Sequence, residues 1–163
     1  MGARRLLPPP LNCFWLFLPV LAFDALYAAA LPAALQPDIF WRDIPPVLSA
    51  TETVGRVATM VLAAYMPLAF HGARRKLGGL VYLAGMAAYL GSWLALMRLP
   101  ESAWSLSATG FAAPAYTPLV WLAGISLIGS GRSRRLDGAF AVAALAFCAA
   151  HVAHALLVWS RVS

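Results

Sequence analysis

Long apolar runs alternate with short polar segments along the whole of this chain. A helix that crosses the hydrocarbon core of a bilayer, about 30 Å thick, needs about 20 predominantly apolar residues. The runs have about that length, except the fourth, which is somewhat short. The pattern therefore predicts an all-α integral membrane protein with a single membrane domain over residues 1–163. We expect a five-transmembrane-helix bundle, with spans at about 12–35, 51–70, 78–98, 115–129 and 138–159.

Composition supports this class and changes how the charge is interpreted. Hydrophobic residues make up 62% of the chain and charged residues only 11%, while the net charge is +6. Soluble proteins carry about a quarter charged residues, so an ordinary soluble domain is excluded. The basic residues lie in short clusters between apolar runs rather than along one face, and we therefore expect a lipid bilayer and no nucleic acid as partner.

The same basic clusters predict the orientation in the membrane. They lie at the chain start, between the second and third runs, and between the fourth and fifth runs: Arg4, Arg5; Arg74, Arg75, Lys76; Arg132, Arg134, Arg135. With five spans, all three clusters fall on one side, which the positive-inside rule makes cytoplasmic. We expect a cytoplasmic N-terminus, an extracytoplasmic C-terminus, and a multi-pass protein of the cell membrane, as in a bacterial inner membrane.

The connections on the outer side are the longer ones. Residues 36–46 contain three prolines, which predicts an irregular segment on the membrane surface. The sequence Ser49, Ala50, Thr51, Glu52 matches a capping box, in which the Ser and Glu side chains satisfy free backbone donors where a helix starts. This motif assigns Glu52 a local role at the start of the second span.

Small residues recur every four positions in the third span, at Ala84, Ala88 and Ser92. Such a stripe lets a neighbouring helix approach closely in a membrane. The spacing predicts that this face of the third span contacts another helix.

One carboxylate, Asp24, lies inside the first apolar run. Insertion scales put the cost of a charge near the centre of a membrane helix at about 2.5–3.5 kcal/mol, so such residues face inward, pair or function. Two interpretations stay open: Asp24 is a protonated or hydrogen-bonded packing residue, or it belongs to a functional site.

Polar residues of other spans are expected at about the same depth in the membrane as Asp24. At about 1.5 Å per residue from the cytoplasmic helix ends, Asp24 lies about 19 Å up, Ser92 about 21 Å, and His151 and His154 about 20 and 24 Å. Arg56, counted from the outer end of its span, reaches a similar level. The sequence therefore predicts a polar pocket in the outer half of the bilayer.

His151 and His154 are three residues apart, so they share one face of the last helix. They are either satisfied histidines of the bundle or partners of Asp24. With Asp24 they have the composition of a metal site with an open position for water. No established zinc motif such as H-E-x-x-H is present.

Arg56 has two interpretations, because Glu52 four residues earlier can pair with it on the helix surface, whereas its fork can also turn inward to Asp24. Tyr89 and Trp121 lie near the polar layer and are packing aromatics or walls of a pocket. The predicted ligand-binding set is therefore Asp24, Arg56, Tyr89, Ser92, Trp121, His151 and His154.

Three classes of function are compatible with this layer. The first is a binding or transport module for a small or lipophilic ligand, in which transport by five spans would require a homodimer. The second is a metal-assisted membrane enzyme that uses Asp24, His151 and His154. The third is an accessory subunit of a larger membrane complex. No nucleotide-binding loop, hydrolase elbow or haem-attachment motif appears, and the sequence assigns no cofactor.

Overall fold

The computed structural model describes residues 8–163, and Arg4 and Arg5, on which part of the predicted topology depends, lie outside the described residues. The described chain is all-helical: it contains no β-strand, only an isolated bridge between Asn12 and Pro67. The elements are, in chain order, η2 (Cys13–Phe17), α1 (Leu18–Tyr27), η3 (Ala28–Ala30), η4 (Ala33–Leu35), α2 (Pro37–Phe40), α3 (Pro46–Tyr65), α4 (Ala73–Arg98), α5 (Ala103–Leu106), α6 (Ala108–Phe111), α7 (Ala113–Tyr116), α8 (Pro118–Gly129) and α9 (Arg134–Val162).

Within the described residues, four helical stretches are long and apolar enough to cross a membrane. They are Cys13–Ala30, Pro46–Tyr65, Ala73–Arg98 and Arg134–Val162. The apolar helix Ala113–Gly129, formed by α7 and α8, is shorter. The predicted membrane class therefore agrees with the fold.

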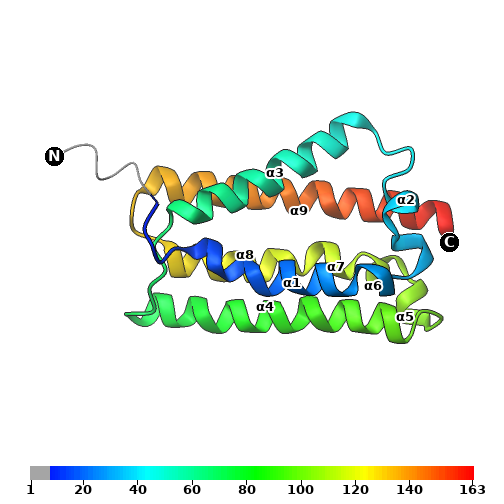
Figure 1. Cartoon of the computed structure of the whole chain (residues 1–163), viewed down its shortest axis with the longest axis horizontal. Helices are drawn as coiled ribbons and strands as arrows, with labels where there is room; N and C mark the ends of the chain where they lie inside the picture. Colours follow the sequence, from blue (N-terminus) through cyan, green and yellow to red (C-terminus); the bar gives the residue numbers. More distant parts are fainter. Residues whose placement is uncertain (1–7) are drawn as a thin grey trace.

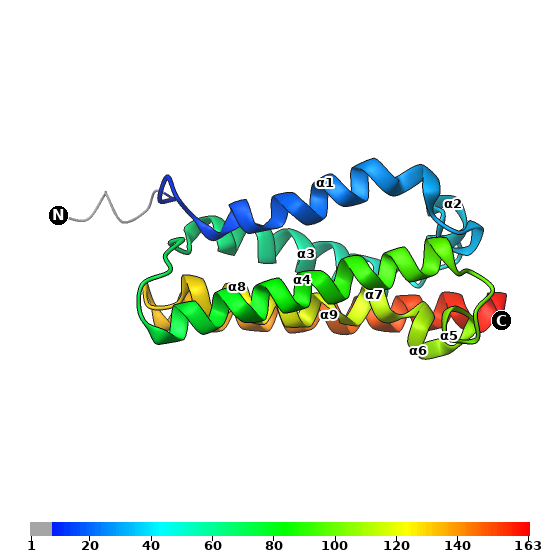
Figure 2. The same cartoon turned by 90° about the horizontal axis from the view of Figure 1, so that it is seen from below.

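The long helices lie side by side in an elongated bundle (Figures 1 and 2). Helix α4 runs along α8, and α3 runs along α9. Cys13, Met66, Ile125, Ile128 and Phe140 are among the fully buried residues of the main apolar core. The arrangement leaves the stretch formed by η2, α1 and η3 as an outer helix of the bundle.

This outer helix is fixed to the bundle at its start. The Cys13 amide donates to the carbonyl of Met66 (2.9 Å), and the Tyr82 hydroxyl of α4 donates to the carbonyl of Leu16 (2.9 Å). Further along, α1 diverges from α9 (Figure 2), while Tyr89 of α4 still reaches it through a hydrogen bond to Asp24 (2.8 Å). The divergence matters because the cavity described below lies between α1 and the other helices.

Helix boundaries differ from the sequence prediction at two places near the site. The first span, predicted to reach residue 35, ends at Ala30, because Pro32 has an extended backbone (φ −52°, ψ 148°) and interrupts the helix. Helix α3 begins at Pro46 rather than near residue 51. The prediction of a capping box is therefore wrong, because Ser49 lies in the first turn of α3 and Glu52 lies in the second.

Helices α4 and α9 are longer than predicted. Their first turns include the basic residues 74–76 and 134–135, and α9 continues to Val162. Lys and Arg have high helix propensity and long stems, so a helix accommodates them at the edge of a membrane.

Close contact between α4 and α8 is made by glycines. A Cβ atom placed on Gly85 would lie 2.4 Å from the Trp121 backbone nitrogen, and one on Gly124 would lie 2.4 Å from that of Tyr82. The predicted small-residue stripe does not make this contact, because Ala84 and Ala88 are exposed. The two helix backbones meet where both surfaces lack a side chain.

Candidate functional site

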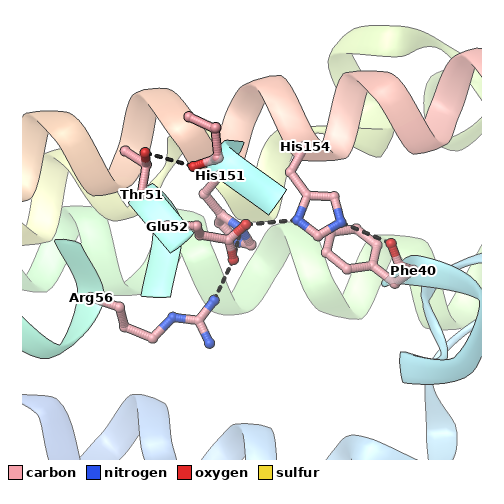
Figure 3. Close-up of polar contacts among 7 residues, drawn as sticks. Phe40, Thr51, Glu52, Arg56, His151 and His154 are labelled. Atoms are coloured by element: carbon pink, nitrogen blue, oxygen red, sulfur yellow. Dashed lines mark hydrogen bonds and ion pairs between the residues drawn. The ribbon is translucent and has the colours of Figure 1, made fainter. Parts of the chain in front are cut away.

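A buried carboxylate, Glu52, is the centre of the polar network. It lies on α3, and its side chain is fully shielded from solvent. Its Oε1 accepts from Arg56 Nη2 at 2.6 Å and lies 3.1 Å from His151 Nδ1, and its Oε2 lies 2.6 Å from His154 Nδ1 (Figure 3). One carboxylate thus joins α3 to both histidines of α9.

His154 links this carboxylate to the segment before α3. Its Nε2 lies 2.8 Å from the carbonyl oxygen of Phe40, the last residue of α2 (Figure 3). The ring of Phe40 stacks on the imidazole with centroids 4.0 Å apart, and Trp41 contacts it edge-on at 4.7 Å. The predicted surface segment, residues 36–46, therefore contributes a backbone carbonyl and aromatic rings to a buried site.

The two contacts of His154 indicate where its ring protons lie. Both of its ring nitrogens face oxygen acceptors, and an imidazole nitrogen makes a favourable contact with an acceptor only through a proton. Nε2 therefore donates to Phe40, and a second proton is shared between Nδ1 and Glu52. In this arrangement the Glu52–His154 pair carries two protons, one on Nε2 and one between Nδ1 and Glu52 Oε2.

His151 and Arg56 lie where this network meets the cavity. The imidazole of His151 stacks on Phe147 (5.5 Å between centroids, 15° between planes), and the guanidinium of Arg56 lies 5.4 Å from the centroid of the same ring. The side chains of His151 and Arg56 are 19% and 41% exposed. The predicted Glu52–Arg56 pair at four-residue spacing is confirmed.

The second carboxylate, Asp24, has a different partner. Tyr89 of α4 donates its hydroxyl to Asp24 Oδ1 at 2.8 Å. Among the described residues, no Lys, Arg or His side chain forms an ion pair with Asp24, although Arg56 and His151 are close enough to attract it through their charge. The histidines were predicted to face Asp24, whereas the acid that they contact is Glu52.

A cavity of about 370 Å³ lies between α1, α3, α4, α8 and α9. Five of the predicted site residues line it: Asp24, Arg56, Tyr89, Trp121 and His151. The other two predicted residues are not in its wall. His154 is fully buried behind it, and Ser92 donates its hydroxyl to the Tyr89 carbonyl of its own helix at 2.7 Å.

The walls of the cavity are mainly apolar and rich in aromatic rings. Aromatic residues of the wall include Phe17, Phe23, Tyr27, Phe40, Trp41, Tyr89, Trp93, Trp121 and Phe147. Trp121 is buried, and its indole nitrogen has no hydrogen-bond partner among residues 8–163. Cavities of this size and character, with a few convergent polar groups, are typical of sites for small ligands.

The predicted metal set is not assembled. Among the described residues, no group of three or more His, Cys, Asp or Glu side chains is arranged to hold a metal ion. Asp24 is bound to Tyr89, and the inward nitrogens of the two histidines are directed to Glu52.

No protein-family model, curated protein or solved structure shows significant similarity to this chain.

Glu52 and Phe40 are the site residues that sequence reasoning missed. The sequence places the start of α3 near residue 51, about five residues or 7 Å beyond its observed start at Pro46. This error assigns Glu52 to a capping box instead of to the buried side of the helix. Its four-residue spacing from Arg56 within an apolar helix was a usable signal. Phe40 contributes a backbone carbonyl, which no side-chain pattern reveals.

Proposed function

We propose that this chain is a small polytopic membrane protein that binds a small lipophilic ligand in the cavity between α1, α3, α4, α8 and α9. The observation that carries the proposal is the cavity of about 370 Å³, whose apolar walls converge on the polar groups of Asp24, Tyr89, Arg56 and His151. Ligand sites have volumes of about 300–1000 Å³ and combine apolar walls with a few placed polar groups. Ionisable residues inside membrane helices mark functional sites by default.

The proposed setting is a cell membrane crossed five times, with a cytoplasmic N-terminus and an extracytoplasmic C-terminus. The alternation of basic clusters supports this orientation. The fifth crossing is assigned in this proposal to Ala113–Gly129, a shorter apolar helix whose length is at the lower limit for a membrane span, about 17 residues. In this orientation the cavity opens in the outer half of the bilayer.

A cavity-filling substitution tests ligand binding directly. Val20 is a buried residue of the cavity wall on α1, whereas Leu18 on the same helix is 40% exposed and is not in the wall. Val20→Trp should fill part of the cavity, and Leu18→Trp should leave it unchanged. Both variants and the wild type would be purified in native-lipid nanodiscs and extracted for mass spectrometry of small molecules.

A ligand should be extracted from the wild type and from Leu18→Trp in equal amount, and at least about tenfold less from Val20→Trp, as expected from the steric cost of overfilling a packed site. The proposal fails if no small molecule other than bulk lipid is extracted from the wild type and none of a panel of lipophilic compounds changes its tryptophan fluorescence. It also fails if Val20→Trp retains the ligand.

A further inference from the structure

The two carboxylates of the site have unequal numbers of basic partners. Glu52 receives Arg56, His151 and His154, which are the basic side chains near the site that form ion pairs among the described residues. Asp24 receives only the neutral hydroxyl of Tyr89, on one of its two oxygens. The cavity wall therefore holds a carboxylate that has no ion-pair partner among the described residues.

A lone carboxylate at this position is unfavourable. Asp24 lies within the apolar stretch Cys13–Ala30, where a charge is costly unless it is paired or keeps a proton. Asp24 also lines the cavity, so a bound molecule can reach its free oxygen. A cationic group in the cavity would supply the missing charge.

The walls around Asp24 favour the same kind of group. Tyr27, Tyr89, Trp41, Trp93 and Trp121 share the cavity with Asp24. The faces of such rings attract cations, and the attraction grows when water is excluded. An aromatic wall beside one carboxylate is the chemistry that recognises an organic ammonium ion with an apolar body.

Arg56 does not reverse this preference. Its charge is compensated by Glu52 at 2.6 Å, and its guanidinium lies over the ring of Phe147. An anionic ligand at Arg56 would have to compete with a buried carboxylate that also holds both histidines. Asp24 forms no ion pair among the described residues, and Arg56 and His151 act on it only at longer range.

We propose that the ligand of this cavity is a lipophilic organic amine, bound as its ammonium ion, with Asp24 as the counter-ion. The inference rests on the proposed ligand-binding function and specifies its chemical class. Tyr89 positions the Asp24 carboxylate through its hydroxyl, and the aromatic wall takes the apolar body of the amine.

Three probes of similar size distinguish a cationic, a neutral and an anionic ligand: phenylbutylamine, phenylbutanol and phenylbutanoate. Their affinities would be measured by tryptophan fluorescence at neutral pH on purified full-length protein in nanodiscs. Variants are Asp24→Asn, which keeps the shape and removes the charge, and Asp38→Asn, a matched control at an exposed position outside the cavity wall. Partition into the lipid is the same for all variants and is subtracted with empty nanodiscs.

The amine should bind the wild type about 10- to 100-fold more tightly than the alcohol, as expected for a hydrogen bond to a charged group. Asp24→Asn should remove that preference and leave the alcohol affinity unchanged, which also shows that the variant is folded. Asp38→Asn should behave as the wild type.

Equal affinity of Asp24→Asn and the wild type for the amine would overturn the cation assignment, while alcohol binding would leave the proposed ligand-binding function intact. Tightest binding of phenylbutanoate would also overturn it and would assign the polar end of the cavity to Arg56. Absence of binding by all three probes would contradict both the ligand class and the binding function.

Discussion

At the scale of single residues, Glu52 has the largest number of ionic contacts within residues 8–163. It is the shared acceptor of Arg56, His151 and His154, and its side chain has no solvent contact to replace them. A buried ionic network of this kind is stable only when it is complete, since removing one member leaves the others buried and uncompensated. A solely local capping role, which the sequence suggested, would cost about 1 kcal/mol or less on removal.

The first prediction concerns this difference. Glu52→Ala should lower the free energy of unfolding by about 3–5 kcal/mol, the range for breaking a buried ion pair by removing one partner. Reversible unfolding in mixed micelles, followed by circular dichroism, measures the change. Glu101→Ala is the matched control, because Glu101 is exposed in the connection after α4, and it should cost less than about 0.5 kcal/mol. A loss of only about 1 kcal/mol for Glu52→Ala would instead support a local capping role for Glu52.

The second prediction separates the two histidines. His154 is fully buried and has polar partners at both ring nitrogens, whereas His151 is 19% exposed and has one, at 3.1 Å. His154→Ala should therefore cost about 2–4 kcal/mol, the sum of a buried cavity and unpaired polar groups. His151→Ala should cost about 1 kcal/mol. The same unfolding measurement compares them, and equal losses would mean that the contact of His154 with Phe40 contributes nothing.

At the scale of secondary-structure elements, α4 and α8 are held in register by glycines. The backbones meet at Gly85 and Gly124, where any side chain would collide with the opposite backbone. Their contact positions Tyr89 and Trp93 on α4 and Trp121 on α8 around the cavity. The contact between α4 and α8 therefore holds the two helices together and also fixes three aromatic residues of the cavity wall.

The third prediction tests this contact. Gly124→Ala should destabilise the protein by about 1–3 kcal/mol, because the added methyl group meets the Tyr82 backbone and the helices must separate. Gly91→Ala, on α4 with nothing within 4 Å of the added atom, should be neutral or stabilising by up to about 1 kcal/mol, since alanine is the better helix former. Thermal unfolding of the two variants in the same detergent decides the matter. Equal behaviour would show that the helices are not in backbone contact.

At the scale of the whole molecule, the fold is an elongated bundle (Figures 1 and 2) in which the outer helix is fixed at its start and then diverges from α9 (Figure 2). Backbone hydrogen bonds near Met66 hold its start, and the cavity occupies the space where it diverges. The connections at the two ends of the bundle are separated by the full length of the long helices. Their exposure to either side of a membrane reports how many times the chain crosses.

The fourth prediction concerns topology. Single cysteines at His71, Glu101 and Ser133 lie at exposed positions, and the two native cysteines, Cys13 and Cys148, are buried free thiols. With five crossings, a membrane-impermeant maleimide applied to intact cells should label Glu101→Cys and spare His71→Cys and Ser133→Cys. Permeabilised cells should allow labelling of all three. Labelling of Ser133→Cys from outside would mean that Ala113–Gly129 does not cross.

The apolar runs alone determined the all-helical membrane class, because helix-spanning lengths of apolar residues have few other stable solutions. Local spacing also predicted that His151 and His154 share a face and that Glu52 can pair with Arg56, since both follow from the helical repeat, and the structure selects that pair over the alternative of Arg56 with Asp24. The estimated depths placed Asp24, Arg56, Tyr89, Trp121 and His151 at one level, and these five residues line one cavity. Depth carries no information on which way each helix is turned.

Only the tertiary structure decided that the histidines contact Glu52 rather than Asp24, because that choice depends on where α3 starts and how α9 is rotated against it. The carbonyl of Phe40 likewise enters the site through the path of a short segment between helices, which no periodicity of side chains encodes.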